Sequence, residues 1–72
     1  MKIEVRHYGA GGRPVAQRVE LPAGSRMHDL LARLGLPEAE VGFLLVNQGD
    51  GSFDRVLQDG DRVTIIPPIG GG

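Results

Sequence analysis

The stretch SRMHDLLARLGLP, residues 25–37, carries the clearest secondary-structure signal in this chain. Its apolar residues recur at the spacing of one face of an α-helix, and they are Met27, Leu30, Leu31 and Leu34. Ser25 stands where an N-cap residue belongs, while Gly35 and Pro37 stand where a left-handed C-cap and a helix breaker belong. We therefore expect one amphipathic helix, which needs an apolar surface to pack against.

The residues before this helix have the alternation of a half-buried strand. Apolar and polar side chains alternate over residues 2–8 and again over 15–21. The segment 9–14 between them is rich in glycine and ends in proline, as turns often do. The pattern predicts a β-hairpin ahead of the helix.

The residues after the helix predict more strands. Residues 41–46 are apolar on both faces, and residues 62–66 are rich in β-branched side chains and end at a pair of prolines. We expect a loop over 47–52 and at most a short edge strand over 53–57. The order is β-β-α-β-(β)-β, which predicts an α+β roll, a four- or five-stranded sheet with one helix on one face. We expect the first and last strands to lie side by side at its centre.

Composition narrows the classes of function. The chain has 72 residues, no cysteine and a net charge of −1, which fits one small domain without disulfides, zinc knuckles or thiol chemistry. It has no excess of Lys and Arg for nucleic acid, no apolar run of membrane-helix length and no signal-peptide pattern at its start. We expect a cytoplasmic protein that binds neither nucleic acid nor membrane, with a domain over 1–66 and a flexible, extended tail over 67–72.

The residues that could support catalysis have simpler roles. His7 and His28 lack further ligands of a metal site, and Ser25 lacks the setting of a nucleophile. Asp59 and Asp61 flank a glycine, which is typical of a solvated turn. The glycines of the first turn lead into a strand rather than a helix and lack the Lys that follows in a phosphate-binding loop. The residues therefore argue against an enzyme.

The end of the sequence, PPIGGG over residues 67–72, is its most unusual feature. Pro67 and Pro68 stiffen the chain, and six extended residues reach about 20 Å. Gly70, Gly71 and Gly72 have no Cβ, so a narrow channel could close around them and present the carboxylate of Gly72 to a reagent. A frayed tail is the plain alternative.

Three segments, FLLVN at 43–47, VLQDGDRV at 56–63 and IPPIGGG at 66–72, resemble the MoaD/ThiS family of small sulfur carriers. The resemblance implies a ubiquitin-like β-grasp fold and a carrier rather than an enzyme. It also implies that a separate ubiquitin-activating-type (MoeB/ThiF-like) enzyme uses Mg-ATP to adenylate the carboxylate of Gly72. A sulfur donor then displaces AMP to leave a thiocarboxylate, which a sulfur-acceptor synthase subunit consumes. No cofactor is expected on the carrier itself.

The branch of the family follows from smaller features. Pro67 and Pro68 are similar to the tails of molybdopterin-synthase small subunits, whereas the chain is closer to the thiamine carriers in length and the additional Gly70 departs from the commonest molybdopterin tail. A MoaD-like carrier in molybdenum cofactor biosynthesis is the first expectation, and a ThiS-like carrier for the thiamine thiazole is the second. A ubiquitin-like modifier joined to lysine through Gly72 and an inert β-grasp binding module are the further alternatives.

A carrier of this kind also needs a docking face. Within 41–46, either Val41, Phe43 and Leu45 or Leu44 and Val46 must face away from the single helix. We expect the following residues to contact the partner: Phe43, Leu45, Ile66, Pro67, Pro68 and Ile69. The alternative is that Phe43 belongs to the core.

Overall fold

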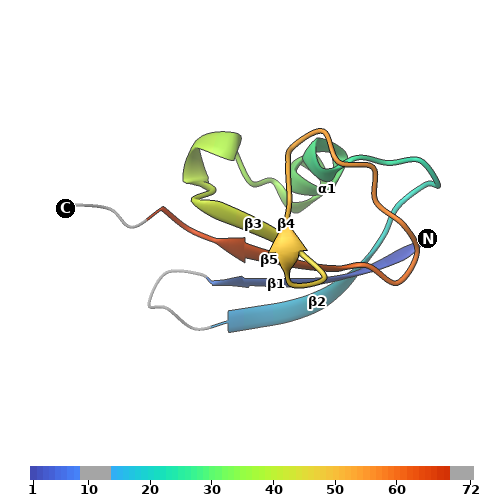
Figure 1. Ribbon diagram of the computed structural model, residues 1–72, viewed down its shortest axis with the longest axis horizontal. Helices are drawn as coiled ribbons and strands as arrows, with labels where there is room; N and C mark the ends of the chain where they lie inside the picture. The colour runs from blue at the N-terminus through green and yellow to red at the C-terminus, as the bar shows by residue number, and fades with distance from the viewer. Residues whose placement is uncertain (9–13, 69–72) are drawn as a thin grey trace.

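The computed structural model describes residues 1–8 and 14–68. Five strands form one mixed sheet in the order β2-β1-β5-β3-β4 (Figure 1). Their bounds are β1 Lys2–Tyr8, β2 Pro14–Glu20, β3 Phe43–Val46, β4 Gly49–Asp50 and β5 Arg62–Ile66. β1 and β5 pair in parallel, while every other pair of neighbours is antiparallel. The first and last strands therefore lie side by side near the centre of the sheet, as predicted.

One face of this sheet is covered by α1, Met27–Leu34, and by the short 3-10 helix η1, Glu38–Glu40 (Figure 1). The predicted apolar stripe of α1 faces the sheet, with Met27, Leu30 and Leu31 buried. Gly35 ends the helix in the left-handed region at a φ of 69°, as its position predicts. No helix in the described part of the chain is long and apolar enough to cross a membrane.

A single apolar core lies between α1 and the sheet. It takes alternate residues from β1, β3 and β5 and one residue, Val19, from β2, so that directly paired residues such as Ile3 and Val19, or Leu44 and Ile65, fall on the same side. The other buried apolar residues are Val5, Leu21, Met27, Leu30, Leu31, Val46, Leu57 and Val63. With the core on one side only, the opposite face of the sheet has no helix over it among the residues described.

The start of α1 differs from the prediction. Ser25 is not its N-cap, because its hydroxyl donates to the carbonyl of Pro22 at 2.7 Å. The N-cap residue is Arg26, whose backbone N–H donates to a carboxylate oxygen of Asp29 at 2.8 Å. This is the backward half of a capping box, in which a side chain three residues later satisfies the N-cap amide.

The segment 53–57, for which we expected at most a short edge strand, forms no regular strand. It contributes one isolated bridge, between Val56 and Arg26, and otherwise covers the start of α1. The carbonyls of Arg55 and Phe53 accept hydrogen bonds from the first two helical amides, at 2.9 and 3.0 Å. Leu57, the last residue of this segment, is 2% exposed and belongs to the apolar core. These carbonyls satisfy donors that a helix leaves open at its start.

The fourth strand lies instead within 47–52, where we expected only a loop. Asn47 and Gln48 both have positive φ, 52° and 70°, and join β3 to β4 by a two-residue turn. Positive φ at both positions is the signature of a type I′ hairpin, whose twist matches that of the strands. β4 is only two residues long, which is why alternation could not reveal it.

Candidate functional site

The chain leaves the sheet at the end of β5. Ile66, its last residue, is half-buried, and the carbonyl of Ile66 accepts a hydrogen bond from the amide of Gly42 at 2.7 Å. Pro67 and Pro68 follow and are exposed. Neither proline has an N–H, so no strand ladder can continue through them. The remaining predicted site residues, Ile69, Gly70, Gly71 and Gly72, lie outside the described residues.

Beside this exit, Phe43, Leu45 and Ile66 form an apolar patch on the face away from α1. Phe43 pairs directly with Ile66 across the sheet, and Leu45 pairs with Thr64, so all four side chains share this face. Phe43 is 61% exposed, whereas Leu44 and Val46 are buried on the helix side. The alternative that Phe43 is a core residue is therefore wrong. The patch is accessible and adjoins Pro67.

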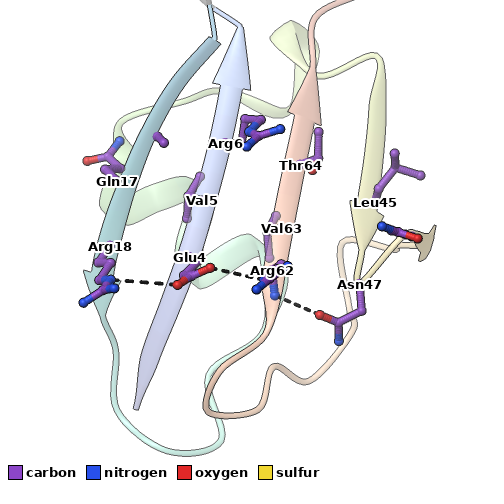
Figure 2. Close-up of a pocket in the computed structure, with 12 residues that line it drawn as sticks. Glu4, Val5, Arg6, Gln17, Arg18, Leu45, Asn47, Arg62, Val63 and Thr64 are labelled. Carbon is purple, nitrogen blue, oxygen red and sulfur yellow. Dashed lines mark hydrogen bonds and ion pairs between the residues drawn. The ribbon is translucent and has the colours of Figure 1, made fainter.

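The rest of the same face carries charge. Glu4 on β1 lies between Arg18 on β2 and Arg62 on β5, at 3.9 and 3.3 Å (Figure 2). Arg6 lies two residues beyond Glu4 on β1 and pairs with Thr64 of β5. These residues line an open cavity of about 790 Å³. The arginines outnumber the one carboxylate here, so this half of the face is basic and suited to an acidic partner surface.

Sequence reasoning missed the junction that holds the start of β5. Asp61 is only 8% exposed, contrary to the expectation that both carboxylates of the Asp-Gly-Asp turn are solvated. Its carboxylate accepts hydrogen bonds from the side-chain amide of Asn47 at 3.0 Å and the backbone of Gln58 at 2.8 Å. Asn47 in turn accepts from the amide of Arg62 at 3.0 Å (Figure 2). The junction thus ties the β3–β4 turn to β5.

Asp59, the other carboxylate of this turn, is exposed and accepts a hydrogen bond from the amide of Lys2 at 2.7 Å. The amide of Gly60 also donates to the carbonyl of Lys2, at 2.8 Å. The two segments that meet at this junction are separate motifs in the sequence, FLLVN at the end of β3 and the Asp-Gly-Asp turn before β5. Only the fold brings the two together.

The histidines occupy separate places. His7 Nε2 lies 3.4 Å from the side-chain nitrogen of Gln17, and His28 Nδ1 lies 3.9 Å from a carboxylate oxygen of Asp54. Across residues 1–8 and 14–68, no group of three or more His, Asp or Glu residues could hold a metal ion. The glycine loop at 9–12 that we compared with a phosphate-binding loop lies outside the described residues. Within the part of the chain that the structure describes, neither histidine therefore belongs to a metal-ligating cluster.

Comparison with known proteins agrees with this geometry. Residues 8–72 match the ThiS family. The chain belongs to the ThiS family. Its members are non-catalytic carriers, which in general work with an E1-like adenylating enzyme.

Individual relatives of this ThiS-family chain extend the comparison. Protein RnfH of Halorhodospira halophila is 35% identical over an alignment of 68 residues, and the match covers 86% of this chain and 70% of RnfH. A putative molybdopterin converting factor subunit 1 from Pyrococcus furiosus has a TM-score of 0.69 at 28% identity, with 94% of this chain and 98% of that one covered. SAMP1 from Haloferax volcanii has a TM-score of 0.73 at 22% identity, with both chains fully covered. The fold is the ubiquitin-like β-grasp, as the sequence resemblance implied.

Proposed function

We propose that this ThiS-family chain is a sulfur carrier, activated at the carboxylate of Gly72. The observation that supports this most is the family match over residues 8–72, which includes the terminal glycines. The exposed, proline-stiffened exit from β5 is consistent with a segment that a partner enzyme must reach. The carrier would supply the substrate atom and the docking face, and the partner would supply catalysis.

The chemistry has two steps on the proposed terminal carboxylate. A carboxylate oxygen attacks the α-phosphorus of Mg-ATP in the partner, and pyrophosphate leaves to give an acyl adenylate. A sulfide-level donor then attacks the acyl carbon, the bond to the AMP oxygen breaks, and AMP leaves with its electron pair. The product is a thiocarboxylate and the carrier's own backbone is otherwise unchanged. Adenylation is needed because a free carboxylate has no good leaving group.

The apolar patch is the docking surface that we propose for the adenylating enzyme. Phe43 is an exposed aromatic residue next to the exit of the tail, and aromatic anchors often dominate protein interfaces. Leu45, Ile66, Pro67, Pro68 and the adjoining Ile69 would complete the contact. A partner seated there would meet the tail as it leaves the sheet.

We further propose the MoaD-like branch, in which the thiocarboxylate supplies sulfur to a molybdopterin synthase. Pro67 and Pro68 ahead of the glycines favour it, as does the likeness to the Pyrococcus furiosus protein. Incubation of the thiocarboxylated chain with a molybdopterin synthase large subunit and its precursor tests this branch. Sulfur transfer to a thiazole synthase instead would assign the ThiS-like branch.

Intact-mass analysis of the chain from its own cells, under mild non-reducing conditions, tests the carrier function. We expect a species heavier by the difference between one sulfur and one oxygen, mapped to Gly72. Larger species carrying the tail on lysine would instead make the chain a protein modifier. An unmodified mass, even after ATP, sulfide and the adenylating enzyme are added, would contradict any activated function.

Docking is tested separately with Phe43→Ala and a matched control, Val15→Ala. Val15 is also exposed, at 46%, but it is paired with His7 and lies on the opposite side of the sheet. We expect Phe43→Ala to raise the KM of adenylation at least tenfold, which is about 1.4 kcal/mol of lost binding. Val15→Ala should leave KM within twofold. Equal effects of the two changes would contradict the proposed docking face.

A further inference from the structure

The two prolines that follow β5 lie directly against the backbone of Gly42. A Cβ at residue 42 would stand 2.7 Å from Pro68 Cα and 2.8 Å from both Pro67 O and Pro68 N. All three are backbone atoms, so no side-chain rotation could relieve the contact. The absence of a side chain at residue 42 is what lets the exit segment pass this close.

Gly42 differs in this from the turn glycines. Gly24, Gly35 and Gly60 have positive φ, and a Cβ on any of them would meet nothing within 4 Å. Those three positions need glycine for the backbone conformation. Gly42 has no such φ, and its amide is engaged with Ile66 at 2.7 Å. The requirement at Gly42 is therefore close approach.

We propose that Gly42 is a positioning residue that sets the direction in which the tail leaves the sheet. This rests on the proposed function, since the direction matters only if a partner receives the tail. The strand before the exit is already fixed at both ends, by the Asp61 junction at its start and by the Gly42–Ile66 hydrogen bond at its finish. The prolines then carry that direction onward, because their rings lock φ.

The size of the effect follows from the contact distances. Moving Pro68 Cα from 2.7 Å to an ordinary contact near 3.4 Å requires a shift of about 0.7 Å. Over the roughly 7 Å of chain from Ile66 to Pro68 this is a rotation of about 6°. Over the roughly 20 Å that six residues would reach if fully extended, a rotation of this size corresponds to a displacement of about 2 Å at the far end. A misplacement of about 1 Å is enough to cost a reaction on the order of a hundredfold.

The test compares Gly42→Ala with Gly49→Ala in the full chain. Gly49 is the matched control because its Cβ would meet only Val46 O, at an ordinary 3.5 Å, and its φ is not positive. ATP–pyrophosphate exchange with the adenylating enzyme gives kcat and KM for each variant. We expect Gly42→Ala to lower kcat at least tenfold and to keep KM within twofold, while Gly49→Ala keeps both.

A structural readout that needs no partner accompanies the kinetics. In the wild-type chain, NMR should show nuclear Overhauser contacts between the α-protons of Gly42 and Pro68, and Gly42→Ala should lose them while the core contacts remain. If Gly42→Ala does not fold, Pro68→Gly replaces it, because it leaves the core intact and removes the stiffness that transmits the direction. It should then show the same fall in kcat.

The outcomes separate the two proposals. If the wild-type chain supports exchange and Gly42→Ala has the same kcat, the positioning role is overturned and the carrier function stands. So would a Pro68→Gly variant with wild-type kcat. A wild-type chain that supports no exchange with the adenylating enzyme would overturn the carrier function and the positioning role that rests on it.

Discussion

Changing Asp61 to Asn should destabilise the fold far more than the same change at Asp59. Asp61 accepts from two donors, one on each carboxylate oxygen, and is almost fully buried. An Asn there offers one acceptor oxygen and turns its NH₂ toward the second donor. The loss of one hydrogen bond to a charged group, with a buried donor left unpaired, costs about 2 kcal/mol.

That loss is large for this chain. A domain of 72 residues is expected to have a free energy of unfolding of about 4–11 kcal/mol. A destabilisation of about 2 kcal/mol therefore lowers Tm by roughly 8–16 °C. Asp59 is exposed and accepts from one donor, the amide of Lys2, which an Asn oxygen serves equally well. Asp59→Asn should change the free energy of unfolding by less than about 0.5 kcal/mol.

Urea titration followed by far-ultraviolet circular dichroism measures both variants, since the chain has no tryptophan to report by fluorescence. A double-mutant cycle between Asn47→Ala and Asp61→Ala adds a direct measure of the bond that joins them. We expect a coupling of at least about 0.5 kcal/mol. Equal losses at Asp59 and Asp61, or no coupling, would refute the assignment of the junction.

Three further changes probe other parts of the fold. Gly35→Ala should lower the free energy of unfolding by about 1 kcal/mol in urea titration, because a residue with a Cβ is strained at a φ of 69° even though that Cβ would contact no other atom. Gly35→Asn should lower the free energy of unfolding by less. Gln48→Gly should raise it by about 0.5 kcal/mol, since Asn-Gly is preferred in a type I′ turn, and a loss would contradict that turn. Glu4→Gln should change the free energy of unfolding by less than about 1 kcal/mol, because the ion pairs to Arg18 and Arg62 are exposed. A larger loss of stability that persists in about 1 M salt would contradict this.

The elements that the sequence predicted best are those whose evidence is local. The stripe of α1 and the left-handed φ of Gly35 follow from residues within two helical turns. The start of α1 was misjudged because the groups that satisfy its first amides come from Arg55 and Phe53, far along the chain. The two-residue β4 was missed because alternation needs more residues to be visible.

The site shows the same division between local and distant evidence. Pro67 and Pro68 could be named from sequence because proline alone sets the local chain path. The partition of 41–46 could be stated only as two alternatives, since alternation gives the two faces but not which one meets the helix. Gly42 carried no signal at all, because nothing in the spacing of residues 42 and 68 shows that their backbones touch.

The two faces of the sheet differ in role: one packs into the apolar core, and the other carries the proposed docking surface. The buried apolar residues lie on the helix side, so the open face and the exit segment contribute little to the core. Phe43→Ala should therefore leave Tm nearly unchanged while it weakens docking, whereas Asp61→Asn should lower Tm and leave the docking face chemically intact. β5 belongs to both halves, because Val63 and Ile65 fill the core while Thr64 and Ile66 face outward next to the tail. β5 therefore links the buried core to the exit at Pro67 and Pro68, and under the proposed function it is the strand that orients the tail toward the partner enzyme.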